Sequence, residues 1–394
     1  MILIGIDGNE ANVKNRVGIG EYAFQLLKQL ESQKSKVKSQ KSFFIYLKEK
    51  PLPDLPRETE GWKYKVFGPK KFWTQFALPL HLYFESPRPD VFFSPTHYAP
   101  RFCPVPSVIS VMDLSFFEFP EMFKKRDLVQ LKSWTAYSVK KATKVLTISY
   151  ASKNDIIKYY KVPEKKIVVT YPGYKKNDGK ILRNKDIKMD IERMKTKYKI
   201  RGDYILYVGT LQPRKNLIRL IEAFRKIREL DEWKNREKKR STPLLQLVIA
   251  GKKGWMYNEI FQKVKDLKLE KNVIFTGFVP DEDLPVLYKG ARCFVLVSLY
   301  EGFGIPVLEA MSFGCPVVIS NVSSLPEVGG RVAIYVDPYD VDDIARGILE
   351  VLHYDAMTHH SRVEEGKRWV KKFSWEKCAR ETLSVLEEAA KLKF

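Results

Sequence analysis

Short, nearly continuous apolar runs alternate with segments of helical spacing from the start of the chain. Residues 1–7 form one such run, typical of a strand buried on both faces, and residues 21–30 then carry apolar side chains at the spacing of a helix. Further apolar runs follow at 43–47, 91–94, 107–111, 144–148 and 167–170. Because the gaps between them are long enough for helices, the pattern predicts a mostly parallel sheet.

The same alternation begins again in the second half of the chain. Strand-like runs lie at 204–209, 245–250, 273–276, 293–297, 316–320 and 333–336. We therefore expect an α/β protein with two Rossmann-like, doubly wound domains at 1–172 and 201–372, joined by a linker region at 173–200 that is rich in Lys, Asp, Asn and Gly. Residues 373–394 are expected to form a helix, capped by Ser374, that docks on the body of the protein. Ligands of such sheets bind at the carboxyl ends of the strands, so the expected site is a cleft between the two halves.

The net charge indicates which classes of partner the protein could bind, and the cysteines indicate its cellular compartment. Subtracting 47 acidic from 69 basic residues leaves a formal charge of +22, which favours partners that carry phosphate, on nucleic acid, anionic lipid or a small molecule. Two Lys-rich stretches, 31–42 and 231–242, contain one aromatic residue between them, Trp233, so we interpret them as solvated loops and disfavour nucleic acid. The four cysteines form no C-x-x-C pair, which favours a reducing compartment.

Targeting segments and several well-known catalytic motifs are absent from the sequence. No signal peptide is expected, and no apolar run approaches the roughly 20 residues of a membrane-spanning helix. We therefore expect a cytoplasmic protein whose only contact with a membrane is peripheral, at its inner face. The sequence contains no G-x-x-x-x-G-K-[ST], G-x-G-x-x-G, H-E-x-x-H or G-x-S-x-G, and its five histidines have no spacing that indicates a metal site.

The most informative stretch is 300–316, where a loop joins a buried strand to a helix. The glycines on either side of Phe303 would let a ligand approach the backbone, and Pro306 suits the first turn of the helix. The amides of Phe303, Gly304 and Ile305 are then expected to point from the positive end of the helix and to bind a diphosphate.

Charged residues flank this turn in sequence or are expected at the same edge of the sheet. Glu301 in the loop and Glu309 about one turn inside the helix can accept hydrogen bonds from sugar hydroxyls. For Glu309 alone, compensation of the helix dipole is an equally good explanation. Arg214 and Lys215 follow the strand at 204–209, where they could clamp a diphosphate and neutralise its charge as it departs.

Two features of the first half have both a functional and a structural interpretation. Gly18 and Gly20, directly before the first helix, would allow a phosphate or sugar to approach the backbone, but a tight turn without a ligand also explains them. Asp113 follows the strand at 107–111 and is either an acceptor-binding carboxylate or a helix N-cap. The sequence leaves both alternatives open.

Together these stretches resemble the retaining glycosyltransferases of the GT-B fold, in group 1 or family 4, and especially their mannosyltransferase-like members. The resemblance covers nearly the whole chain. Its most specific part is E-G-F-G-I-P-x-L-E-A-M-x-x-G-x-P-V, in which Glu301 and Glu309 form a Glu-x7-Glu element. Three other stretches agree with it, namely V-G-x-x-x-x-R-K-N, F-T-G-x-V and L-P-E-V-x-G.

The resemblance implies a reaction and its partners. A hexose, mannose among the candidates, would pass from a nucleotide-diphosphate sugar to a saccharide or lipid-linked acceptor, with retention at the anomeric carbon. The nucleotide sugar would be a co-substrate, and neither a further cofactor nor a metal ion is expected. The second half would hold the donor and the first half would present the acceptor, in the synthesis of a cell-surface glycan.

The resemblance also implies roles for the residues that hold the donor. Arg214 and Lys215 would hold the diphosphate, Glu301 would contact hydroxyls of the donor sugar, and Glu309 would bind the ribose. Gly209, Phe303 and Gly304 would belong to the same nucleotide-sugar site. The main chain at Phe278 and Val279 would border the base, and Gly18 would lie against the phosphates.

One position departs from the family. Its members usually carry His directly before the Asp that is Asp113 here, and this chain has Met112. His97 is a candidate for part of the missing role. The departure keeps two alternatives open, a catalytically weak nucleotide-sugar-binding protein and, on the same fold, a sugar-nucleotide epimerase or hydrolase.

The segment 70–79 combines basic and aromatic residues. It could touch an anionic membrane that carries a lipid-linked acceptor, or it could be a structural helix of the first domain.

Overall fold

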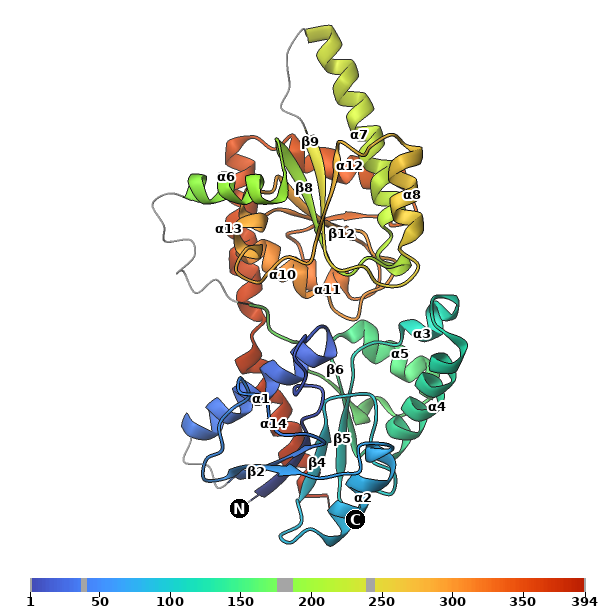
Figure 1. The fold of residues 1–394 in the computed structure, drawn as a ribbon, viewed down its shortest axis with the longest axis vertical. Coiled ribbons are helices and arrows are strands. Elements are labelled where there is room, and N and C mark those ends of the chain that lie inside the picture. The colour runs from blue at the N-terminus through green and yellow to red at the C-terminus, as the bar shows by residue number, and fades with distance from the viewer. Residues whose placement is uncertain (1, 37–40, 176–186, 239–244, 393–394) are drawn as a thin grey trace. The chain divides into compact units, whose positions relative to one another are not determined.

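A computed structural model describes residues 2–36, 41–175, 187–238 and 245–392 of the chain. The fold divides into two compact units, each of which is an α/β assembly with helices on both faces of one sheet (Figure 1). Unit 1 comprises Met1–Gly173 together with Phe373–Phe394, and unit 2 comprises Tyr174–Lys372.

Unit 1 contains a seven-stranded sheet in the order β3-β2-β1-β4-β5-β6-β7, in which every neighbouring pair is parallel. The strands are β1 (Ile2–Asp7), β2 (Lys41–Leu47), β3 (Trp62–Val66), β4 (Val91–Ser94), β5 (Ser107–Val111), β6 (Lys144–Thr147) and β7 (Ile167–Val169). The central strands β1, β4 and β5 are mostly apolar and almost entirely buried, as parallel strands covered by helices require.

The helices of unit 1 cover both faces of this sheet. They are α1 (Ile19–Lys36), α2 (Leu78–Phe84) with the preceding π-helical turn η1 (Trp73–Ala77), α3 (Ser115–Glu118), α4 (Lys125–Lys141), α5 (Tyr150–Tyr160) and α14 (Trp375–Ala390), with short 3-10 turns η2 (Pro120–Met122) and η3 (Glu164–Lys166). Phe93 packs with α1 and α14, whereas Phe92 packs with η1 and α2. Because successive side chains of a strand point to opposite faces, α2 lies on the face of the sheet opposite to α1 and α14.

The last helix, α14, returns to unit 1 and completes its core. The Ser374 hydroxyl accepts a hydrogen bond from the Lys377 amide at 3.1 Å and so caps the helix. Cys378 and Leu386 are fully buried in the same core as the first strand. The backbone of Trp375 lies so close to Gly173 that a Cβ there would come within 2.2 Å of its nitrogen.

Unit 2 contains a six-stranded parallel sheet in the order β10-β9-β8-β11-β12-β13. The strands are β8 (Asp203–Val208), β9 (Leu245–Ala250), β10 (Val273–Gly277), β11 (Cys293–Leu296), β12 (Val317–Ser320) and β13 (Ile334–Val336). The helices are α6 (Ile187–Tyr198), α7 (Leu217–Lys238), α8 (Asn258–Asp266), α9 (Leu284–Gly290), α10 (Ile305–Ser312), α11 (Leu325–Gly329), α12 (Val341–Leu352) and α13 (Ala356–Trp369), with 3-10 turns η4 (Pro213–Lys215) and η5 (Val370–Lys372).

The predicted pair of doubly wound parallel sheets is confirmed, and both have the same strand order. In each sheet the first strand has the second on one side and the fourth on the other, so the winding direction reverses once. The reversal lies between β1 and β4 in unit 1 and between β8 and β11 in unit 2. Ligands of such sheets bind beyond the carboxyl ends of these two strands.

Some local expectations differ from the structure. The Lys-rich residues 31–36 and 231–238 continue α1 and α7 rather than forming loops, because Lys, Glu, Gln and Arg are good helix formers. The rest of the expected loops, 37–40 and 239–242, lies outside the described residues. The range 173–200 contains α6, in which Met194 is buried. Among the described residues, none of the helices is both long and apolar enough to cross a membrane.

Candidate functional site

Two loops meet at the reversal point of the unit 2 sheet. One follows β8 and leads through η4 into α7, and the other follows β11 and leads into α10. Since β8 and β11 are hydrogen-bonded neighbours, their carboxyl ends open at the same edge. The first loop carries Arg214 and Lys215 and the second carries Glu301, so the sheet brings together residues that are 86 positions apart.

Glu301 is the centre of a buried charge cluster. Its Oε1 lies 2.5 Å from the Lys215 Nζ, and its Oε2 lies 3.5 Å from an Arg214 guanidinium nitrogen. The Ser298 hydroxyl donates a further hydrogen bond to Oε1 at 2.7 Å. The side chains of Glu301, Arg214 and Lys215 are only 9%, 14% and 14% exposed, so this cluster is shielded from solvent far more than a surface ion pair.

The net charge of the cluster follows from its contacts. Burial raises the pKa of Glu301, but the positive charges of Lys215 and Arg214 and the hydrogen bonds from Lys215 and Ser298 outweigh it, so the pKa lies below its ordinary value. The carboxylate is therefore ionised at neutral pH. Glu301 thus contributes one negative charge to the cluster, and Lys215 and Arg214 contribute two positive charges at the edge of the sheet, where cations suit an anionic ligand.

Main-chain and amide contacts fix the two loops to each other. The Leu299 amide donates to the Arg214 carbonyl at 2.9 Å, and the Arg214 guanidinium donates to the Tyr300 carbonyl at 2.5 Å. Asn216 has a left-handed backbone, and its side-chain amide donates to the carbonyls of Val297 at 2.9 Å and Pro338 at 2.7 Å. These contacts hold the cations in place before any ligand arrives. Sequence reasoning gave no role to Asn216, although it completes the R-K-N triplet.

Two serine hydroxyls form hydrogen bonds to the main chain of the glycine-rich turn before α10. The Ser324 hydroxyl donates to the carbonyls of Glu301 at 2.8 Å and Phe303 at 2.9 Å, and Ser323 donates to the Glu301 carbonyl at 2.6 Å. Gly304 precedes α10 with a φ of 111°, and a Cβ there would lie 2.8 Å from a methyl group of Leu325. The sequence did not reveal the role of either serine, because each binds a carbonyl that lies 21 to 23 residues earlier in the chain. The serines directly precede the L-P-E-V-x-G stretch, to which the sequence analysis gave no structural role.

Glu309 lies on the first turns of α10 and is partly buried. The Tyr288 hydroxyl, on α9, donates to its Oε2 at 3.3 Å. Burial and the neighbouring carboxylate raise the pKa of Tyr288 well above its ordinary value, so the hydroxyl keeps its proton and remains a donor. Glu309 thus has a fixed partner in unit 2, and its expected contact with a ribose stays a prediction.

Three strands of unit 2 end in glycine at the same edge. Gly209 follows β8, Gly251 follows β9 and Gly277 ends β10. A Cβ on Gly251 would lie 1.9 Å from the Gly209 carbonyl oxygen, so no other residue fits there. Directly beyond them Val279 is buried, while Phe278 is exposed and carries the Lys252 ammonium 4.5 Å from its ring centroid. This edge therefore presents bare backbone next to an aromatic face.

The candidate residues of unit 1 lie at the ends of its central strands. Gly18 is exposed directly before α1 with a φ of +52°, a conformation that favours glycine. Its loop follows β1 and is anchored by Arg16, which donates to the Ala11 carbonyl at 2.7 Å and pairs with Asp54. The structure thus explains Gly18 by the turn that it makes, and its expected contact with phosphates stays a prediction.

The strand end after β5 shows what replaces the usual histidine of the family. The Met112 side chain is buried in the core, and its carbonyl accepts a hydrogen bond from the Ser152 hydroxyl at 2.9 Å. Asp113 accepts from the Ser115 amide at 3.0 Å and the Ser115 hydroxyl at 2.8 Å, so it fixes the start of α3. The N-cap residue of α3 is Leu114, so Asp113 lies one residue before the cap, and its expected binding role stays a prediction.

His97 follows β4, at the reversal point of the unit 1 sheet, and lies within electrostatic reach of Asp113. Burial lowers the pKa of His97 and the Asp113 charge opposes this, leaving the pKa below its ordinary value. The imidazole is therefore neutral at neutral pH. Its Nδ1 is buried and makes no hydrogen bond to the part of the chain that the structure describes.

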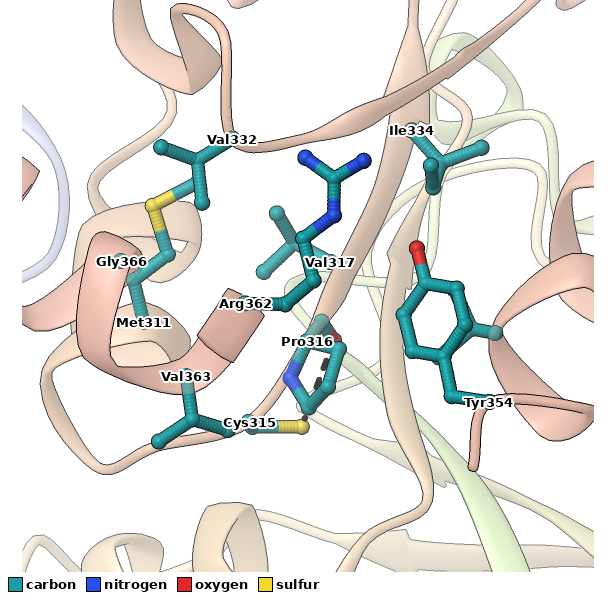
Figure 2. A pocket seen from close by; sticks show the side chains of 11 residues that line it. Met311, Cys315, Pro316, Val317, Val332, Ile334, Tyr354, Arg362, Val363 and Gly366 are labelled. Carbon is teal, nitrogen blue, oxygen red and sulfur yellow. Dashed lines mark hydrogen bonds between the residues drawn. The ribbon is translucent and has the colours of Figure 1, made fainter. Parts of the chain in front are cut away.

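Two other observations bear on ligands. Within the described ranges, His, Cys, Asp and Glu side chains form no group of three that could hold a metal ion, and the expected independence of metal stays a prediction. Figure 2 shows a small pocket of unit 2 lined mostly by apolar residues, among them Met311, Val317 and Val332. It adjoins the amino end of β12, whereas the charge cluster follows the carboxyl ends of its strands, so the two are separate.

Comparison with known families places both units. The sequence profile described as "Glycosyl transferases group 1" matches residues 189–369, and that described as "Glycosyltransferase Family 4" matches residues 18–177. The chain is 36% identical over 280 residues to the O-antigen chain mannosyltransferase B of Escherichia coli, covering 71% of this chain and 69% of that protein. It is 32% identical over 232 residues to the O-antigen chain mannosyltransferase RfbU of Salmonella typhimurium, covering 59% and 57%.

Solved structures share the fold at low sequence identity. The Anabaena protein Alr3699/HepE, in complex with UDP and glucose, has a TM-score of 0.70 at 18% identity, over 98% of this chain and 99% of that one. WaaG, a glycosyltransferase involved in lipopolysaccharide biosynthesis, has a TM-score of 0.69 at 14% identity, again over 98% and 99%. These likenesses support the expected GT-B architecture.

Proposed function

The chain belongs to the group 1, family 4 glycosyltransferases, and on that premise we propose that it transfers a mannosyl group from a nucleotide-diphosphate mannose to a saccharide. The donor sugar is inferred from relatives described as O-antigen mannosyltransferases, to which up to 36% of aligned residues are identical. By the same inference the product is part of a cell-surface glycan. Family membership confirms the predicted glycosyltransferase and does not favour the epimerase or the weak binding protein.

The observation that carries the proposal is the buried cluster of Lys215, Arg214 and Glu301 at the sheet reversal point. A departing nucleoside diphosphate gains negative charge as the glycosidic bond to it breaks. Preorganised cations in a shielded site stabilise such charge without reorganising at the moment of reaction. The positive end of α10, at the same edge, adds to this stabilisation.

The finer roles are part of the same proposal. We assign the diphosphate to Arg214 and Lys215, the donor hydroxyls to Glu301 and the ribose to Glu309. The base would lie against the main chain at Val279. We further infer retention at the anomeric carbon and no requirement for a metal ion, because two side-chain cations can provide the neutralisation that a metal would otherwise supply.

The experiment is a panel of nucleotide sugars tested by thermal shift and by transfer. A donor at about 100 times its dissociation constant should stabilise the protein by about 2.7 kcal/mol. We expect a mannose nucleotide to give the largest shift and to be consumed only when acceptor is present, with metal chelator making no difference. NMR of the product should show the anomeric configuration of the donor. Consumption without acceptor would instead indicate a hydrolase or epimerase.

The acceptor would be carried by a lipid at the cytoplasmic face of a membrane. This part of the proposal draws on the excess of 22 positive charges, which attracts the chain to anionic lipid. Transfer to a lipid-linked saccharide in vesicles should therefore be faster than transfer to the same saccharide in solution.

A further inference from the structure

The helical segment at residues 72–84 of unit 1 is apolar on both of its faces. It contains no Asp, Glu, Lys or Arg, and it forms η1 and α2 in succession. Trp73, Leu78 and Leu82 are fully buried against the sheet. A helix that packs on a sheet buries one apolar face, and its opposite face is ordinarily polar because it contacts water.

The second face is exposed and continuous. Phe72, Phe76, Leu80 and Phe84 are 55%, 64%, 57% and 84% exposed, and they recur at every fourth position, so their side chains form one stripe along the helical segment. Tyr83, at 47%, lies beside its end. Single exposed apolar residues are common, but a contiguous apolar stripe on a surface marks a site that something covers.

Positive charge lies at both ends of the stripe. Lys70 and Lys71 precede it, and the Lys71 ammonium is 5.4 Å from the centroid of the Phe72 ring. Arg88 follows it and donates to the Tyr83 carbonyl at 2.5 Å, which ties a guanidinium to the C-terminal end of α2.

Acidic side chains near the stripe are neutralised. Glu85, directly after α2, is 5% exposed and pairs with Lys65 at 2.9 Å. Glu49 pairs with Lys70 at 2.5 Å, which leaves the charges of Lys71 and Arg88 at the two ends of the apolar stripe. This combination of an apolar stripe with a cationic rim is complementary to an anionic lipid surface.

We propose that this face, defined by Phe72, Phe76, Leu80 and Phe84, docks unit 1 on an anionic bilayer. The four side chains enter the boundary between headgroups and acyl chains, and Lys71 and Arg88 contact lipid phosphates at either end. A protein groove would require matching carboxylates for these cations, whereas a bilayer that contains acidic lipid supplies phosphate everywhere along the stripe. The inference deepens the proposed encounter with a lipid-borne acceptor and is independent of the donor chemistry in unit 2.

The test is co-sedimentation of the full-length protein with vesicles. We expect binding to phosphatidylcholine vesicles that contain phosphatidylglycerol and little binding to pure phosphatidylcholine. The double variant Phe76→Ser/Leu80→Ser should bind the anionic vesicles at least tenfold more weakly. Val129→Ser on α4, which also removes an exposed apolar side chain of unit 1, is the matched control and should bind within twofold of wild type. Because all three side chains are exposed, thermal melts should be unchanged.

Three results would overturn the proposal. One is that the wild-type protein does not bind anionic vesicles. Another is that the double variant binds them as strongly as wild type. The third is a concentration-dependent dimer in light scattering that the double variant abolishes, since a second copy would then cover the stripe. Transfer to a water-soluble acceptor separates this proposal from the enzymatic one, because the double variant should retain it fully. If the wild-type protein binds the anionic vesicles but transfers no sugar, only the proposed glycosyltransferase function is refuted.

Discussion

Replacing Glu301 by Gln removes the carboxylate that pairs with Lys215 and Arg214 in the unit 2 charge cluster, and keeps the size and shape of the side chain. The two cations, each 14% exposed, then lose this negative charge while they remain largely out of water. At 2.5 Å and an effective dielectric constant of about 20, the attraction between Lys215 and Glu301 alone is about 7 kcal/mol before desolvation is subtracted.

Desolvation offsets part of this attraction, and removing one partner of a buried ion pair typically costs about 3–5 kcal/mol. In a domain of the size of unit 2, each kcal/mol lowers the melting temperature by about 2–4 °C, so we expect Glu301→Gln to melt roughly 10 °C below wild type. A saturating nucleoside diphosphate should restore more stability to this variant than to wild type, because the ligand supplies the missing negative charge.

A double-mutant cycle isolates the pair from the rest of the cluster. Lys215→Met should also destabilise, because it leaves the carboxylate with Arg214 as its remaining cation. The double variant Glu301→Gln/Lys215→Met should be less destabilised than the sum of the two single variants, by at least about 1 kcal/mol, as expected for groups in contact. Urea unfolding monitored by circular dichroism gives all four free energies of unfolding. Strict additivity would refute the view that the cluster is one electrostatic unit.

The pH dependence gives an independent check. A carboxylate whose folded-state pKa lies below its unfolded value contributes stability that is present above the unfolded pKa and lost as the pH falls through the folded one. Glu301 should therefore stabilise wild type at neutral pH, with the loss beginning below about pH 4.5. In Lys215→Met, burial opposes fewer stabilising contacts, so the folded-state pKa of Glu301 is less depressed and the acid loss should be smaller and end at a higher pH than in wild type. An unchanged acid limb in this variant would contradict the assignment.

Four further substitutions probe other parts of the molecule. Gly251→Ala should prevent folding of unit 2, because the new Cβ would lie 1.9 Å from the Gly209 carbonyl oxygen. Gly277→Ala, where no described atom lies within 4 Å of the Cβ, should cost only about 1–2 kcal/mol for its φ of +70°, and thermal melts compare the two. Leu386→Ala, fully buried in α14, should destabilise unit 1 by about 2–5 kcal/mol in urea unfolding. His97→Ala should lower kcat for transfer about tenfold and leave the KM for the donor unchanged, which is the effect of losing one hydrogen bond from His97 to a bound substrate. A change in KM alone would refute a role of His97 in turnover.

Regular patterns made the fold of this chain predictable. Strands buried on both faces appear in the sequence as apolar runs, and those at 293–297 and 316–320 were located within one residue at each end. Elements with a weaker pattern were missed. The edge strand β3 alternates aromatic and lysine residues, and α6 has Met194 as its buried residue, so neither gives a continuous apolar signal.

The chemistry of the site was predictable only where it is local. The meeting of Glu301, Arg214 and Lys215 was predictable because each follows a strand, and parallel strands place their carboxyl ends at one edge. The supporting contacts were not found. Asn216 reaches the Val297 carbonyl across 81 residues and the Pro338 carbonyl across 122, and Ser323 reaches Glu301 across 22. Such contacts join loops that are far apart in the sequence, so the spacing of residues within one segment cannot predict them.

The ion pair of Glu301 also reconciles its observed partners with the role that the family resemblance implies. In the structure both oxygens of the carboxylate face cations, so they are not yet available to a sugar. A diphosphate that binds Arg214 and Lys215 competes with Glu301 for them and weakens these contacts, since two anions then share two cations. The released oxygens can accept hydrogen bonds from the hydroxyls of the sugar attached to that diphosphate. Glu301 would thus hold the cations in position in the empty site and recognise the donor in the filled one. This requires that Glu301→Gln lower the affinity for the nucleotide sugar relative to the affinity for the free nucleoside diphosphate.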